Sequence, residues 1–90
     1  MDTASLEQLR VQIDRLDENL VEILARRFRV TEEIGRLKKA MALPAVDEER
    51  EQRQRIRIQA LARQHGLRED VAMKVLRVII EETVLNHRRV

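Results

Sequence analysis

Apolar residues recur with a period of 3.5 between Leu6 and Met41. One row of positions, seven residues apart, is Leu6, Ile13, Leu20, Arg27, Ile34 and Met41, and the interleaved row is Leu9, Leu16, Ile23, Val30 and Leu37. We call these positions the seam. A seam of this period, kept for about five heptads, predicts one long helix that packs against other helices.

Arg27 is the charged residue of the seam. A guanidinium keeps its charge, and its burial without an anionic partner costs several kcal/mol. We therefore expect Arg27 to bind an anionic ligand. Gly35 also interrupts the helical pattern, where glycine costs up to about 1 kcal/mol relative to alanine. It indicates either close helix packing or room for a ligand near the backbone.

The ends of three helices can be read from capping residues. Ser5, followed by Glu7 and Gln8, fits a capping box at the start of the first helix, with Thr3 as the other candidate cap. Pro44 disfavours helical geometry at Leu43, so this helix should end after Met41.

Leu43 to Val46 is then a short linker. Asp47 is the expected N-cap of a second helix, Glu48 to Gln64, and Gly66 its C′ residue. Arg68-Glu69-Asp70 opens a third helix that runs to about His87. Two apolar lines follow it, one through Val71, Val75 and Val78 and one through Leu76, Ile80, Thr83 and His87. The prediction is an all-α chain, residues 1–90 forming a single domain of one long and two shorter helices.

The length of the first helix predicts a homodimer. About 36 residues at 1.5 Å per residue give a rod of roughly 54 Å. A compact monomer of this size has a radius of gyration of only about 12 Å. The remaining residues cannot enclose such a rod, so a second copy should cover its seam.

Composition excludes several classes of protein. The 18 basic and 16 acidic side chains nearly cancel to +2 and alternate along the chain, which is typical of solvated helix faces. Phe28 is the single aromatic residue, so a stacking surface for nucleic acid is absent. There is no cysteine, no signal peptide and no apolar run of membrane-spanning length. We expect a cytoplasmic protein that binds neither nucleic acid nor membrane.

The basic residues of the first helix suggest a binding site for an anion. Arg27 and Lys38 are three helical turns apart and project from nearly the same side, about 16 Å from each other along the axis. Arg10 lies roughly 25 Å from Arg27, too far to serve the same small ligand, but the Arg10 of an antiparallel partner can approach it. The sequence shows no metal-spaced cluster, activated nucleophile or glycine-rich phosphate loop. Such a site suits a reaction that needs only positioning and electrostatic stabilisation.

The later helices add Asp47, Arg50, Glu51, Thr83 and His87 to the candidates. The alternative is that these residues form surface ion pairs of little energetic value. With them, the chain resembles the all-helical chorismate mutase family. The matching pieces are Leu9-Arg10, Ile13-Asp14, Leu16-Asp17, Arg26-Arg27, Ile34-Gly35-Arg36-Leu37-Lys38, Pro44, Asp47-x-x-Arg50-Glu51 and Ile79-Ile80-Glu81-Glu82-Thr83-Val84-Leu85, in the family's order and spacing.

The resemblance implies an intertwined homodimer with two equivalent sites. Each site converts chorismate, a dicarboxylate, to prephenate by a pericyclic Claisen rearrangement without cofactor or metal, a step in aromatic amino acid biosynthesis. Arg27 holds one carboxylate, the partner's Arg10 holds the other, and Lys38 donates to the ether oxygen. The remaining implied contacts are Arg50 beside the pocket, Asp47 and Glu51 at the ring hydroxyl, Thr83 as a hydroxyl group, and Ile34, Ile80 and Val84 as apolar walls.

Two residues depart from the family pattern. His87 stands where glutamine or glutamate is common, and its ring N–H can donate to the ether oxygen beside Lys38. The alternative is a frayed residue near the chain's end. Gln54 occupies a position where we expect an apolar residue.

Other functions fit the same scaffold. Isochorismate pyruvate-lyase and aminodeoxychorismate mutase are the nearest enzymes, although Arg50-Glu51 fits the ordinary mutase better than the lyase. A helical regulatory or dimerisation module that stimulates a partner enzyme of the shikimate pathway is another alternative. A nucleic-acid-binding helical hairpin ranks third, and salt-sensitive binding would reveal it.

Overall fold

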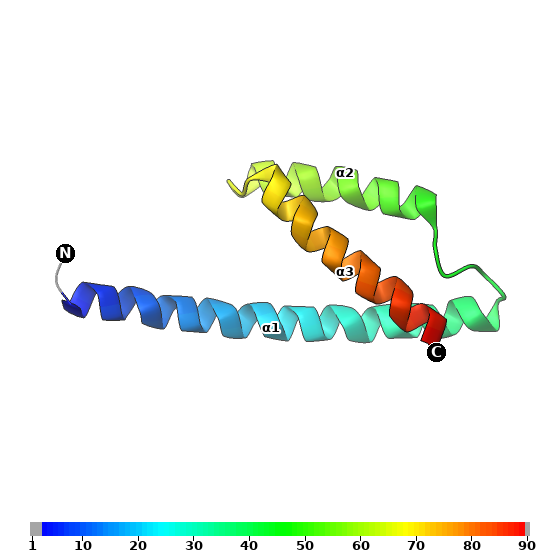
Figure 1. The fold of residues 1–90 in the computed structure, drawn as a ribbon, viewed down its shortest axis with the longest axis horizontal. Coiled ribbons are helices and arrows are strands. Elements are labelled where there is room, and N and C mark those ends of the chain that lie inside the picture. Colours follow the sequence, from blue (N-terminus) through cyan, green and yellow to red (C-terminus); the bar gives the residue numbers. More distant parts are fainter. Residues whose placement is uncertain (1–2, 90) are drawn as a thin grey trace. The chain divides into compact units, whose positions relative to one another are not determined.

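Three helices make up the chain in the computed structural model, which describes residues 3–89 (Figure 1). They are α1 (Thr3–Ala40), α2 (Glu48–Gln64) and α3 (Glu69–Arg89). Residues 3–89 contain no strand. The all-α prediction of one long helix and two shorter ones is confirmed.

The chain divides into two compact units, Met1–Thr31 and Glu32–Val90. The first unit holds most of α1, and the second holds its last turns together with α2 and α3.

The start of α1 differs from the sequence prediction. The helix already includes Thr3, so Ser5 lies inside its first turn, and Ser5 as the N-cap residue is wrong. Ala4, between the two candidates, has the highest helix propensity of any residue type, which favours an earlier start.

The end of α1 is a left-handed turn at Ala42. The backbone N–H of Leu43 donates to the carbonyl of Lys38 at 2.7 Å, and that of Ala42 donates to Lys39 at 3.2 Å. This pair of bonds defines a Schellman motif, whose C′ residue is usually glycine because its φ is positive. Here Ala42 takes that conformation with φ 56°. The helix ends at Ala40, one residue before the predicted last residue Met41, and Pro44 follows the turn.

The ends of α2 match the sequence prediction. Asp47 is its N-cap, with a side-chain oxygen that accepts from the backbone N–H of Arg50 at 3.0 Å. At the other end, Leu67 N–H donates to Ala62 at 2.8 Å and Gly66 N–H donates to Arg63 at 3.3 Å. Gly66 has φ 71°, so it is the C′ residue of a second Schellman motif. The predicted turn residue His65 is exposed.

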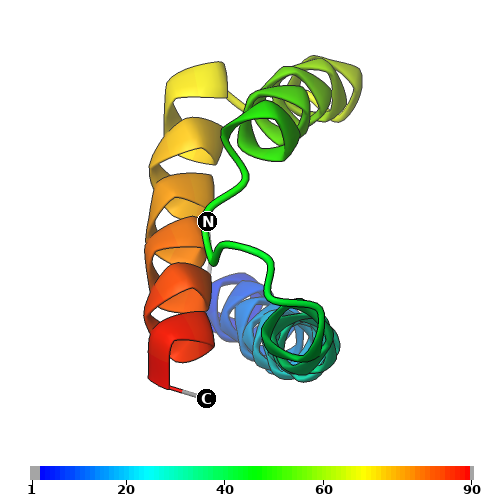
Figure 2. The same ribbon diagram turned by 90° about the vertical axis from the view of Figure 1, so that its right-hand side faces the viewer.

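The core of the second unit lies between α2 and α3, which pack against each other. Its buried apolar residues are Ala62, Ala72 and Leu76. Figures 1 and 2 show the two helices meeting at the turn around Gly66 and diverging toward their other ends. Of the two apolar lines predicted on α3, the line through Leu76 faces the core, whereas Val75 and Val78 are exposed.

The seam is the largest set of exposed apolar side chains. Its apolar members range from 41% exposed at Ile34 to 66% at Met41. Arg27 has intermediate exposure. Burying one aliphatic side chain contributes about 1.5–3 kcal/mol to stability. Burial of the exposed seam would therefore add a large stabilisation. None of the described helices is long and apolar enough to cross a membrane.

Candidate functional site

Two of the predicted site residues, Arg10 and Arg27, belong to the first unit. Arg10 is exposed and its guanidinium pairs with Glu7 at 3.3 Å, one turn away. Exposed pairs of this kind contribute about 0–1 kcal/mol, so Glu7 is a partner that a stronger anion can replace. Both arginines lie on the uninterrupted helix α1. At 1.5 Å per residue they are about 25 Å apart, which excludes joint binding of one small molecule by the same chain.

Lys38 is held by the linker that follows α1. Its ammonium donates to the carbonyl of Ala45 at 3.2 Å, and its own carbonyl accepts from Leu43 through the Schellman motif. The linker therefore folds back over Lys38 and holds both its backbone carbonyl and its side-chain ammonium. An ammonium group has three N–H donors, so one bond to Ala45 leaves two donors for a ligand.

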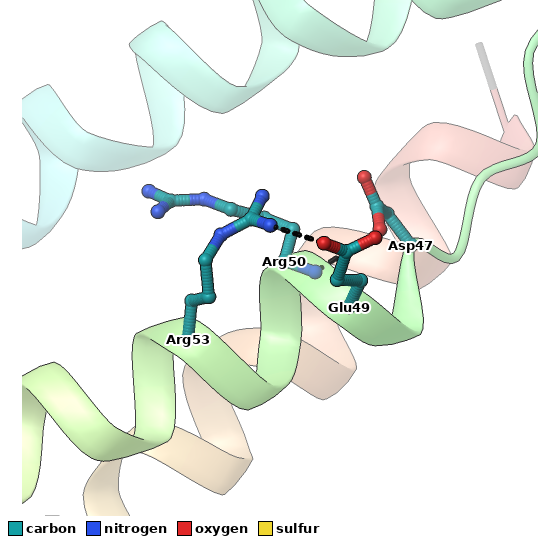
Figure 3. Close-up of polar contacts among 4 residues, drawn as sticks. All are labelled: Asp47, Glu49, Arg50 and Arg53. Carbon is teal, nitrogen blue, oxygen red and sulfur yellow. Dashed lines mark hydrogen bonds and ion pairs between the residues drawn. The ribbon is translucent and has the colours of Figure 1, made fainter.

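The start of α2 carries Asp47, Arg50 and Glu51, and Figure 3 shows the first two with their neighbours. One Asp47 oxygen is used in the cap. Arg53 pairs with Glu49 at 2.9 Å, whereas the guanidinium of Arg50 extends away from that pair (Figure 3). Within residues 3–89 the Arg50 guanidinium makes no hydrogen bond or ion pair. Arg50 is thus a cation of the second unit that is open to an anionic ligand.

The end of α3 carries Thr83 and His87, one turn apart. The Thr83 hydroxyl donates to the carbonyl of Ile79 at 2.9 Å, which leaves its oxygen able to accept. The imidazole of His87 lies against Gly35 of α1 in the same unit: a Cβ built on Gly35 would be 2.7 Å from Cδ2 of the ring. Lys38 is one turn beyond Gly35 on that helix face, so the His87 ring lies about one turn from Lys38 along α1.

A groove of about 560 Å³ runs between α2 and α3. Its apolar lining comes from Met73, Leu76 and Ile80, and its charged lining is Glu51, Arg55, Asp70, Lys74, Arg77 and Glu81. Of the predicted polar site residues, only Glu51 lines it, together with the predicted wall residue Ile80. Lys38, Arg50 and His87 are absent from its lining, so the groove does not coincide with the predicted site.

Several features around the predicted site residues could not be predicted from the sequence. The carbonyl of Ala45, the left-handed turn at Ala42 and the groove residues Arg55 and Glu81 were not predicted. Every residue has a backbone carbonyl, so the sequence does not indicate which carbonyl will accept a hydrogen bond. Alanine rarely has a positive φ, so the sequence does not predict the left-handed turn either. Gln54, the expected apolar position, is half-buried. Among the residues that the structure describes, no cluster of three or more ligating side chains could hold a metal ion.

Comparison with known proteins assigns the chain to a family. The profile of the chorismate mutase type II family matches residues 9–88. A chorismate mutase of Methanocaldococcus jannaschii is 28% identical over 76 residues, which are 84% of this chain and 77% of that protein. The T-protein of Haemophilus influenzae is 29% identical over 85 residues, 94% of this chain but 22% of that longer protein. With cations and hydrogen-bond donors on all three helices and a family match over nearly its whole length, the chain belongs to the chorismate mutase type II family and has the activity of a chorismate mutase.

Proposed function

We propose that two copies of this chain form an intertwined homodimer with two equivalent sites, each built from both chains. The exposure of the seam, from 41% to 66% at its apolar residues, is the observation that carries this proposal. A second copy that covers the seam recovers on the order of 1 kcal/mol for each half-exposed side chain. The apolar floor of the α2–α3 groove offers further surface for the partner.

Each site takes Arg27, Lys38, Asp47, Arg50, Glu51, Thr83 and His87 from one chain and Arg10 from the partner. The 25 Å spacing of Arg10 and Arg27 supports this division, because the two substrate carboxylates are only a few ångströms apart. Arg27 and the partner's Arg10 each bind one carboxylate, and Arg50 adds positive charge beside them. Asp47 and Glu51 accept from the ring hydroxyl, while Thr83 lines the pocket. In this assembly residues 1–90 act as one helical domain.

The reaction needs no covalent step by the protein. In chorismate, the carbon–oxygen ether bond breaks while a carbon–carbon bond forms between the side chain and the ring, giving prephenate. Binding both carboxylates holds the side chain over the ring, which removes much of the entropic part of the barrier. Negative charge grows on the ether oxygen as the bond breaks, so donors there bind the transition state more strongly than the substrate.

Lys38 and His87 supply those donors. The ammonium of Lys38 is already oriented by Ala45 and retains two free N–H groups. The His87 ring adds a second donor from α3, close to the face that carries Lys38. Hydrogen-bond donors fixed before the substrate arrives cost no reorganisation during the reaction, which is why such sites accelerate it.

Subunit mixing tests the shared site. Arg10→Ala and Arg27→Ala are each expected to be nearly inactive as homodimers. After exchange of subunits, half of the dimers are mixed and each contains one intact site, so about a quarter of the wild-type activity should return. Arg27→Ala mixed with Lys38→Ala is the matched control, because both residues come from the same chain and no intact site can form. Equal recovery in both mixtures, or none in the first, contradicts the division of residues between chains.

The identity of the product tests the substrate. Addition of the purified protein should remove the absorbance of chorismate and yield prephenate. Release of pyruvate from isochorismate, followed with a coupled dehydrogenase, would instead indicate the lyase. Turnover without any added partner enzyme of the shikimate pathway would exclude a purely regulatory module. A cytoplasmic location and catalysis without a cofactor stay predictions of the sequence.

A further inference from the structure

Gly35 is buried in the last turns of α1, although Ile34 and Arg36 on either side of it are exposed. The atoms that bury it include those of the His87 ring. A Cβ built on Gly35 would lie 2.7 Å from Cδ2, 3.3 Å from Nε2 and 3.4 Å from Cγ of that ring. Gly35 lies within a regular helix and its φ is not positive. Its backbone conformation is therefore open to any residue, and the ring is what excludes a side chain.

The contact restrains a residue that would otherwise move. His87 is in the last turn of α3, where helices usually fray. Its Nδ1 atom is buried, and its Nε2 and Cδ2 atoms form the edge of the ring that lies nearest to Gly35. A flat ring resting directly on a helix backbone has few alternative orientations, because the backbone offers a rigid surface.

The position of the ring matters for the ether oxygen. Lys38 follows Gly35 by one turn on the same face of α1, and Thr83 precedes His87 by one turn on α3. The Gly35 contact thus places the His87 ring about one helical turn from Lys38 along α1. A change of about 1 Å in the position of a catalytic group can lower a rate about 100-fold.

We propose that Gly35 is a positioning residue, and that its missing side chain forms the seat in which His87 is aligned with Lys38. This inference depends on the proposed donation by His87 to the ether oxygen. Carbon atoms pack at about 3.5–4.0 Å, so a methyl group at position 35 must displace the ring by about 0.8 Å or more. The three heavy atoms nearest to a Cβ built on Gly35 all belong to His87, and the proposal gives Gly35 no contact with the substrate.

A series of double variants tests the seat. Gly35→Ala is measured in three backgrounds, with His87 unchanged, with His87→Gln and with His87→Ala. The rigid imidazole cannot avoid the methyl group, so Gly35→Ala should lower kcat at least tenfold and change KM less than threefold. Glutamine keeps an N–H donor on a flexible chain, so His87→Gln should retain more activity than His87→Ala and should reduce the effect of the methyl group. With His87→Ala, which alone should lower kcat/KM at least tenfold, the methyl group should change kcat less than twofold.

Glu33→Ala is the matched control, since Glu33 is exposed on the same stretch of α1. It should keep wild-type kcat. Helix content and thermal midpoint are recorded for every variant. If Gly35→Ala alone does not fold, the comparison of the glutamine and alanine backgrounds still measures the coupling.

The outcomes separate the two proposals. A loss of kcat that is the same in all three backgrounds overturns the seat, because the methyl group then acts without the ring. An active wild-type protein in which His87→Ala has unchanged kcat/KM removes His87 from the site and overturns the seat with it. A wild-type protein that does not convert chorismate overturns the assigned function itself.

Discussion

Replacement of Ala42 by glycine should stabilise the protein, which is unusual for an alanine so close to a helix. Ala42 has φ 56°, in the left-handed region that L-residues enter at a cost of about 1–2 kcal/mol. Glycine has no such cost, but it loses more conformational freedom on folding, worth about 0.5–1 kcal/mol. The net gain for Ala42→Gly is therefore about 0.5–1 kcal/mol. For a domain of this size that raises the thermal midpoint by about 2–8 °C.

Two matched variants give the opposite sign. Ala60 is exposed and lies inside α2, four residues before its end, so Ala60→Gly should lower the free energy of unfolding by about 1 kcal/mol through helix propensity alone. Gly66 is the C′ residue of the second Schellman motif, with φ 71° and nothing within 4 Å of a built Cβ. Gly66→Ala should therefore be destabilising by about 0.5–1 kcal/mol through the backbone alone.

Thermal unfolding followed by circular dichroism measures all three changes. Each variant is compared at one protein concentration, because the midpoint of a dimer depends on concentration. A midpoint that falls for Ala42→Gly as it does for Ala60→Gly would refute the left-handed turn. The fold-back of the linker over Lys38 would then lose its support as well.

Three further perturbations test the seam, the donor and the cap. Leu16→Glu places a charge in the seam and should give a monomer in sedimentation experiments, whereas Val11→Glu, on the opposite side of the heptad, should remain a dimer. Lys38→Ala should lower kcat by about 100- to 1,000-fold with unchanged helix content, as for other removed transition-state donors, and unchanged kcat would exclude Lys38 from the ether oxygen. Asp47→Ala should cost about 1 kcal/mol of unfolding free energy, and Asp47→Asn, which keeps an acceptor for the N–H of Arg50, should restore most of it.

The sequence alone determined the helices, because their signals are local. The period of the seam, the carboxylate of Asp47, the ring of Pro44 and the freedom of Gly66 each act within a few residues of the chain. Their effects are therefore readable without knowing what packs where. The start of α1 was predicted wrongly because several neighbouring residues can act as the N-cap. Small differences in helix propensity among them determine the residue at which the helix begins.

The candidate site was predictable as a set of residue types and spacings, but not as contacts. The sequence allowed two roles for Gly35, close helix packing or room for a ligand. The structure places the His87 ring against it. The hydrogen bond from Lys38 to Ala45 depends on the left-handed turn at Ala42. An alanine in the sequence does not predict such a turn, because left-handed positions are usually occupied by glycine. These features join residues that are distant in sequence or involve backbone atoms common to all residues. Only the folded arrangement of the second unit decides them, since a side chain's partner is set by where the helices bring it and not by its neighbours along the chain.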